Sequence, residues 1–434
     1  MLQQATASEA AGQIADAIRL RGTAAAVNLA GAIAVGAAIA WIVMLPGLGI
    51  ASRGLWLGLA GLIVADNMWA YLQVNLRSQR RYGLCSSLSI LMAALSTGLG
   101  VLGAYWQGLP GFLAALGLSY LLTFAIAFPL GSRYPNPSIN WADVSRLLRI
   151  GMPIMMSDLL KVLMWNVDKI MIWMLMGKHS LGIYALQSTI TNGIMLLPAG
   201  VADVFYPHVV SEIGRSKSAG TAARYLTQGV ELLSRSMCPM LAVIFLCFHL
   251  PIRWLLPAYQ ETVAPGQVLV LATFFPVAGT IAGSVLLALG GQRTQLVASA
   301  IAVVVAVICV GAAILSGGGY VAIALGAAAG LLARASISIG AAIVRAQLSV
   351  PERVQFLGRL VAAFVLVVVA VAGATWAIPD SPDSLLQDCL FTTVRCAIAL
   401  AILSPFIVST LRARRRYAGS RHEGAAGDES ADHA

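Results

Sequence analysis

Long apolar stretches recur along the whole chain, and most charged residues lie in the short segments between them. A helix needs about 20 consecutive apolar residues to cross the hydrocarbon core of a bilayer. By this criterion we expect twelve spans, at residues 23–45, 54–76, 84–106, 109–130, 148–176, 181–205, 233–256, 262–289, 295–315, 320–345, 356–378 and 387–411. The sequence therefore predicts an all-α integral membrane protein, because helices satisfy their own backbone hydrogen bonds within lipid.

Composition supports this class and argues against several others. The chain is 59% hydrophobic and 11% charged, whereas roughly 25% of the residues in a soluble domain are charged. The net charge is +10, but the basic residues lie in short loops between apolar runs, so we expect no nucleic-acid partner. The six cysteines form no CxxC or zinc-ligand spacing. With no P-loop or nucleophile elbow, the sequence predicts no enzyme activity, cofactor or metal site.

Lysine and arginine predict the orientation of the spans. Twenty of these residues fall in alternate loops and at the two ends of the chain, whereas the opposite loops hold only Arg53, Lys178 and Arg253. Because cytoplasmic loops are enriched in Lys and Arg, both termini should be cytoplasmic. Residues 1–22 are predicted to be a cytoplasmic segment, because they have no apolar core typical of a signal peptide. The polar tail at 412–434 is predicted to be disordered.

A weak internal repeat predicts two lobes. The Gln79-Arg80 and Gln292-Arg293 pairs lie 213 residues apart, each between two apolar spans. With this offset, spans one to four match spans seven to ten, as in transporters built from repeated units. We therefore expect an N-terminal lobe of four spans at 23–130, a C-terminal lobe of six spans at 148–345 and an extra helix pair at 356–411. The N-terminal lobe would lack two helices relative to the other.

The span at 148–176 contains more charge than a lipid-facing helix tolerates. On one continuous helix, at about 100° per residue, its polar side chains fall within an arc of roughly 120°. These are Ser157, Asp158, Lys161, Trp165, Asp168 and Lys169, with Asn166 just outside the arc. Intramembrane charges of this kind line a water-filled cavity or pair with one another. Both interpretations stay open: a substrate-binding face, or a neutral charge pattern that holds helix against helix.

Other polar residues within the spans extend the candidate site. Gln187, Thr191 and Asn192 lie in the sixth span, and Arg334 lies in the middle of the tenth. Arg334 either binds an anion or pairs with a neighbouring helix. Asp66 shares one face of the second span with Gln73 and Arg77 and is a candidate for ion coupling. The glycine pairs at 279–283 and 326–330 are interpreted as points of close helix packing.

One region resembles a known family. Residues 148–225, with GMPIMMS, VDKIMIWMLMG, LGIYALQ, LLPAG and VFYPHV, resemble the second lobe of polysaccharide (O-antigen and exopolysaccharide) flippases. These belong to the multidrug/oligosaccharidyl-lipid/polysaccharide (MOP) exporter superfamily. The resemblance implies two six-helix lobes around a central cavity, from which this chain departs by lacking two helices.

The resemblance also implies a function and a location. A flippase of this family moves a polyprenyl-diphosphate-linked oligosaccharide across the bacterial inner membrane by alternating access, for lipopolysaccharide or exopolysaccharide biosynthesis. Lys161, Lys169 and Arg334 would then be the candidates for binding its anionic head. The implied partners are membrane lipids and, in a larger complex, polysaccharide polymerase or assembly proteins.

Three alternative functions remain to be compared with the pattern, and two of them need a feature that it lacks. A cation-coupled exporter of small organic molecules needs an acidic cavity, whereas the charged span balances two carboxylates with two lysines. A membrane-embedded glycan polymerase needs a large periplasmic loop, which the predicted topology lacks. A non-transporting partner of a polysaccharide synthesis complex is compatible with the shortened N-terminal lobe.

Overall fold

The computed structural model describes residues 14–44, 53–79, 81–129, 141–216, 219–378, 384–406 and 408. These residues form helices and their connections, and no strand occurs among them, which confirms the predicted all-α class. The predicted tail at 412–434 and the start of the predicted N-terminal segment, through residue 13, lie outside the described residues.

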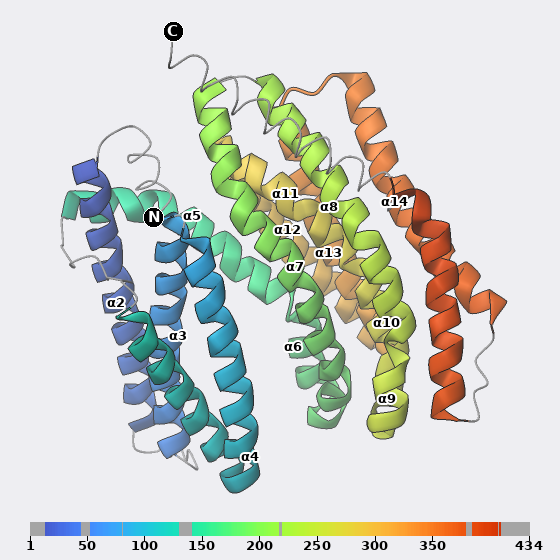
Figure 1. Ribbon diagram of the computed structural model, residues 1–434, viewed down its shortest axis with the longest axis horizontal. Helices are drawn as coiled ribbons and strands as arrows, with labels where there is room; N and C mark the ends of the chain where they lie inside the picture. Colours follow the sequence, from blue (N-terminus) through green and yellow to red (C-terminus); the bar gives the residue numbers. More distant parts are fainter. Residues whose placement is uncertain are drawn as a thin grey trace. The chain divides into compact units, whose positions relative to one another are not determined.

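The chain divides into two compact units, Met1–Met152 and Pro153–Ala434, called unit 1 and unit 2 below. The helices are shown in Figure 1. In chain order they are α2 (Ile14–Met44), α3 (Arg53–Ser78), α4 (Tyr82–Ala127), α5 (Trp141–Met164), α6 (Val167–Leu175), α7 (Lys178–Ser216), α8 (Ala219–Cys247), α9 (His249–Leu255), η1 (Pro257–Thr262), α10 (Val263–Ala272), α11 (Phe274–Ala288), α12 (Gln292–Leu315), α13 (Gly319–Arg345) and α14 (Val350–Ala377). A last helix spans Leu385–Phe406.

Nine helical segments of the described residues are long and apolar enough to cross a membrane. One of them, the 46-residue α4, covers the predicted span at 84–106 and residues 109–127 of the predicted span at 109–130. Its two arms meet at Gly108, whose φ of 62° is a conformation that glycine adopts without strain. The helices that cover the predicted spans at 148–176 and 181–205 are not among the nine.

In unit 1 the core lies between α3 and the two arms of α4. Trp69, Leu72 and Leu76 of α3 pack against Cys85 and Leu88 of α4. The two arms of α4 also approach each other closely, because a Cβ atom on Gly103 would overlap the backbone of Gly111. Small residues therefore allow this hairpin to close.

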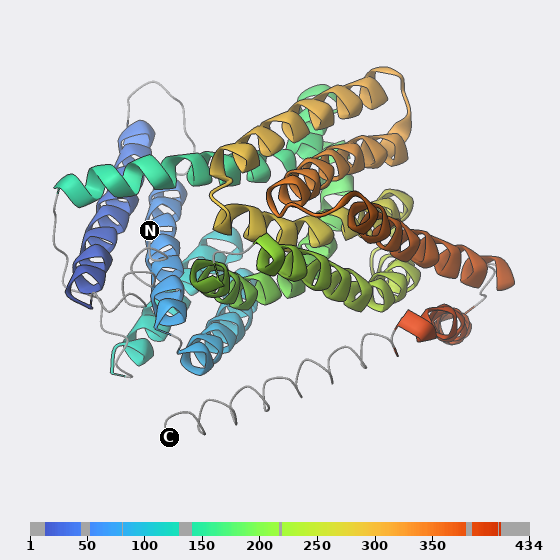
Figure 2. The ribbon, with the colours of Figure 1, turned by 90° about the horizontal axis from the view of Figure 1, so that it is seen from above.

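Unit 2 is built around α11, in which most side chains are buried. Leu226 and Val230 of α8, Ile339 of α13 and Phe356 of α14 belong to the same core cluster as the α11 residues 277–286. Figure 2 shows α12 and α13, coloured gold and orange, running side by side in this unit. The helix 385–406 packs through Ala399 and Leu403 into the core cluster that contains residues of α8 and α14.

The glycines at 326 and 330 bring α12 and α13 into backbone contact, as predicted. A Cβ atom on Gly326 would lie 2.8 Å from the backbone of Cys309 and Val310 on α12, and one on Gly330 would lie 2.7 Å from Cβ of Ala306. Distances this short leave no room for a methyl group, so a substitution must separate the two helices.

Gly326→Ala is expected to destabilise unit 2 by about 1–3 kcal/mol, the usual cost of overpacking a core. A methyl group added at Gly340, on the same helix, would have no atom of a neighbouring residue within 4 Å, and Gly340→Ala should be neutral or stabilising by up to about 1 kcal/mol. Thermal unfolding of the two purified variants in detergent checks this difference. Equal unfolding temperatures would contradict the close packing of α12 and α13.

Candidate functional site

The predicted helix at 148–176 is interrupted, and the expectation of one continuous helix is wrong. α5 ends at Met164 and α6 begins at Val167. The backbone N–H of Asn166 bonds the carbonyl of Leu163, only three residues back, while the Asn166 side chain donates to the carbonyl of Val162 at 2.8 Å. The side chain thus takes the acceptor that the backbone N–H of residue 166 would use in an α-helix.

Because of this break, the charged residues do not form one stripe. Asp168 on α6 is buried, with 4% of its surface exposed. The hydroxyl of Tyr184 on α7 donates to Oδ2 of Asp168 at 2.9 Å, and the backbone N–H of Lys169 donates to Oδ1 at 2.9 Å. The Lys169 ammonium lies 3.4 Å from the same carboxylate and donates to the carbonyl of Trp165. Asp168 and Lys169 therefore join α6 to α7 and to the end of α5.

The predicted polar residues of the sixth span lie on α7, within about one turn of each other. Gln187 and Thr191 are buried, whereas Asn192 is exposed. Thr191 donates to the carbonyl of Gln187 at 3.1 Å. The side-chain amide of Gln187 makes no well-formed hydrogen bond with a described residue. Among the described residues, Gln187 is thus a buried polar group of α7 without a well-formed partner.

A second polar group, here called the serine–arginine cluster, connects α5, α12 and α13. Its members are Ser157, Gln295, Ser299, Arg334 and Ser338. The hydroxyls of Ser157 and Ser299 lie 3.1 Å apart, and Arg334 donates to the Ser299 hydroxyl at 3.3 Å. Arg334 of α13 is thus joined to α12 by a charge-assisted hydrogen bond to a neutral hydroxyl.

Asp158 and Lys161 lie on α5 next to Ser157. Their side chains form an ion pair at 2.9 Å and are 60% and 41% exposed, respectively. The predicted pairing of these two residues is therefore confirmed. Arg334 lies near this pair, because Arg334 and Ser157, the residue before Asp158, both contact the Ser299 hydroxyl. In this part of unit 2 one carboxylate accompanies two cations, Lys161 and Arg334, which favours the binding of an anion.

Asp66 lies in unit 1. It is exposed on α3 and accepts a hydrogen bond of 2.8 Å from the hydroxyl of Tyr120 on α4. Gln73, predicted on the same face, donates instead to the Ser89 hydroxyl at 3.2 Å. The ion-coupling role of Asp66 remains a prediction.

Three members of the serine–arginine cluster were missed by the sequence analysis: Gln295, Ser299 and Ser338. A signal for them was present, because Gln295 and Ser299 are spaced by four residues, as are Arg334 and Ser338. Residues with this spacing share one face of a helix. The two helices are consecutive, apolar and joined by a short turn. Their polar faces could therefore have been expected to meet.

A family model described as polysaccharide biosynthesis protein matches residues 32–265, which is more than half of the chain. No curated protein matches the chain. Several solved membrane-protein structures do resemble it in fold.

The structure resembles that of the lipid II flippase MurJ with a TM-score of 0.59 and 15% identity, over 94% of this chain and 89% of that chain. For a mutant of the multidrug and toxin extrusion (MATE) transporter VcmN of Vibrio cholerae, the TM-score is 0.62 and the identity 17%, over 80% of this chain and 83% of that chain. For a MOP superfamily transporter from Pyrococcus furiosus, the TM-score is 0.63 and the identity 13%, over 82% of this chain and 83% of that chain. At these identities the likeness is one of fold. The family-model match carries the assignment: this chain belongs to the polysaccharide biosynthesis protein family and has the membrane fold of MurJ and MATE transporters.

Proposed function

We propose that this protein flips a polyprenyl-diphosphate-linked oligosaccharide across the bacterial inner membrane, from the cytoplasmic to the outer leaflet. Family membership supports a role in polysaccharide biosynthesis. The fold supports transport, because proteins of the same fold include a lipid II flippase and MATE transporters. The distribution of Lys and Arg along the chain supports cytoplasmic termini.

The observation that carries the proposal is the charge balance around Asp158. Lys161 and Arg334 supply two positive charges where Asp158 supplies one negative charge, within the predicted spans at 148–176 and 320–345. Ammonium and guanidinium groups bind phosphate oxygens by charge-assisted hydrogen bonds. Charges within a membrane protein are costly and mark substrate pathways. The net positive group therefore suits a diphosphate better than an organic cation.

Neighbouring polar groups suit the sugar part of the same substrate. Trp165 and Asn166 lie at the break between α5 and α6, within five residues of Lys161. An aromatic ring can stack on a sugar, and an amide can bond its hydroxyls. Asn192 is exposed on α7 and offers a further amide. Transport would proceed by alternating access, with the prenyl tail remaining in lipid.

Deletion of the gene tests the proposal. We expect polyprenyl-linked repeat units to accumulate, as measured by mass spectrometry of extracted lipids, while the surface polysaccharide decreases. The accumulated units should resist oxidation by membrane-impermeant periodate applied to spheroplasts, because they remain in the inner leaflet. Wild-type protein supplied in trans should reverse all three changes.

Two other results would contradict flipping. Unchanged lipid-linked units and an intact surface polymer would favour an exporter of other small molecules. A loss of surface polymer without accumulation of lipid-linked units would favour a non-transporting partner of polymerase or assembly proteins.

A further inference from the structure

A polar pocket lies in unit 2 among α8, α9, η1, α10, α14 and the last helix, and it shares no residue with the serine–arginine cluster. Its volume is about 270 Å³. Its polar lining comes from His249, Arg253, Gln260, Gln267, Thr375 and Arg395. Leu246 and Val263 complete the lining. The distribution of Lys and Arg predicts that this end of unit 2 faces the outside of the membrane.

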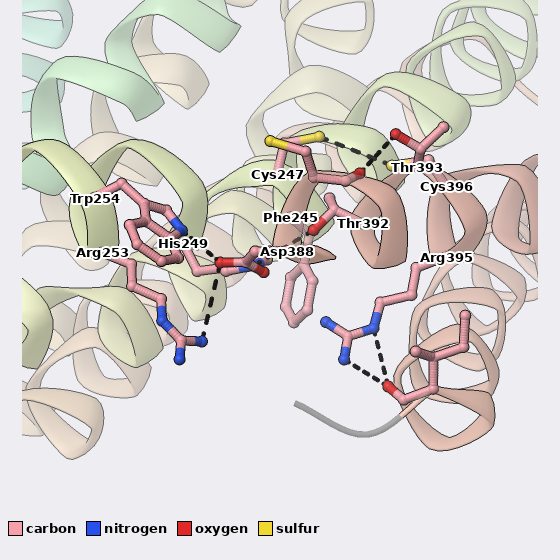
Figure 3. A network of polar contacts seen from close by, with 12 residues as sticks. Phe245, Cys247, His249, Arg253, Trp254, Asp388, Thr392, Thr393, Arg395 and Cys396 are labelled. Carbon is pink, nitrogen blue, oxygen red and sulfur yellow. Dashed lines mark hydrogen bonds and ion pairs between the residues drawn. The ribbon is translucent and has the colours of Figure 1, made fainter. Parts of the chain in front are cut away.

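A buried carboxylate lies next to Arg253. Asp388, 1% exposed, accepts a hydrogen bond of 2.7 Å from Nε1 of Trp254 and lies 3.0 Å from Nε2 of His249. The Arg253 guanidinium is 3.9 Å from the same carboxylate. These contacts join α9 to the last helix, as Figure 3 shows. Asp388 thus orients His249 and Trp254 by hydrogen bonds, and Arg253 lies within ion-pair distance of the same carboxylate.

Arg395 comes to the pocket from the last helix. It is 2% exposed, and its guanidinium donates from Nε to the carbonyl of Ile378 at 3.0 Å. Arg253 and Arg395 both line the pocket, and in the view of Figure 3 they lie on opposite sides of His249 and Asp388. No carboxylate belongs to the described residues that line the pocket. Two arginines held by separate structural contacts therefore face a small space whose described lining is otherwise neutral or basic.

We propose that this pocket binds a phosphate or diphosphate group. Guanidinium groups bind the oxygens of such anions in pairs of parallel hydrogen bonds. A phosphate presents oxygens in several directions and can contact two arginines on opposite sides, which the two oxygens of a carboxylate do less well. The volume is below the roughly 300–1,000 Å³ of whole-ligand pockets, so it suits a head group and not an oligosaccharide. The proposal stands on the pocket alone and does not depend on flipping.

Trp254 offers a local reporter, because its ring centroid lies 5.9 Å from the Arg253 guanidinium. We would label the full-length protein with 5-fluorotryptophan and record ¹⁹F spectra in detergent during titration with sodium pyrophosphate. The Trp254 resonance is assigned by its loss in Trp254→Phe. We expect a saturable shift, with at least about tenfold weaker binding in Arg253→Gln, the usual scale for losing a charge-assisted hydrogen bond. Gln260→Glu, which keeps Arg253 and adds a negative charge, should also weaken binding.

Arg359→Gln is the matched control, because Arg359 also pairs with a carboxylate of unit 2, Glu231, at 3.1 Å. It should bind pyrophosphate as the wild type does. Farnesyl diphosphate and nanodiscs containing phosphatidylglycerol distinguish the source of the anion. Tighter binding of either one than of pyrophosphate identifies a lipid head group, and equal binding identifies a soluble phosphate. If no probe shifts the Trp254 resonance, or if Arg253→Gln and Arg359→Gln bind equally, the pocket is not an anion site.

Discussion

Asp168→Ala is expected to lower the stability of the protein by about 3 kcal/mol, the lower end of the cost of breaking a buried charge pair. The substitution removes the acceptor of the Tyr184 hydroxyl and leaves the Lys169 ammonium without its carboxylate. Tyr184 is completely buried, so water cannot replace the lost hydrogen bond. The effect should appear as a lower unfolding temperature of the purified protein in detergent and as reduced yield from membranes.

Tyr184→Phe separates the two parts of this effect. It removes the hydroxyl but keeps the carboxylate and its contacts with Lys169, and it should cost about 1 kcal/mol. In the double variant the two losses should not add, because both single variants break the same hydrogen bond.

Asp158→Ala is the matched control, since Asp158 also pairs with a lysine, but in an exposed position. Exposed ion pairs contribute at most about 1 kcal/mol, so this variant should unfold close to the wild-type temperature. If Asp168→Ala were equally stable and instead lost transport, Asp168 would be a substrate or ion ligand and not a connection between α6 and α7.

This contrast shows which contacts the sequence could predict. Asp158 and Lys161 are three residues apart on one helix, so helical geometry alone places them together. Asp168 and Tyr184 lie on different helices, and no spacing rule connects residues across a turn of unknown angle. The prediction of one continuous helix over 148–176 placed Asp168 on the same face as Asp158. The competition of the Asn166 side chain for a backbone carbonyl broke that helix and directed Asp168 toward α7 instead.

The fold was more predictable than the contacts, because spans depend on composition over about 20 residues and tolerate local breaks. The prediction of one apolar span at 262–289 still holds, although the structure divides this segment into α10 and α11 at Thr273. A contact between two residues far apart in the sequence depends on those two positions alone, so no average over composition predicts it. His249 and Asp388 are 139 residues apart, and nothing in the sequence indicated that they meet.

Lys161→Ala is expected to reduce transport of lipid-linked oligosaccharide by about tenfold or more, because one charge-assisted hydrogen bond to a phosphate contributes about 1.5–3 kcal/mol. Complementation of the deletion strain, with accumulated polyprenyl-linked units measured by mass spectrometry, gives the readout. The stability of the protein should change little, since the Lys161 side chain is 41% exposed. Arg359→Ala, which removes another exposed cation from an ion pair of unit 2, should transport normally.

Asp158→Ala and the double variant decide what the ion pair does. If Lys161 binds the substrate, Asp158→Ala leaves that lysine available and should reduce transport much less, while the double variant should be as impaired as Lys161→Ala. If the pair is only structural, the harm in each single variant comes from the charge left without its partner, so removing both charges should restore transport. Restoration in the double variant would therefore exclude Lys161 from the substrate site. Arg334 would then be the remaining cation near Asp158 for the diphosphate.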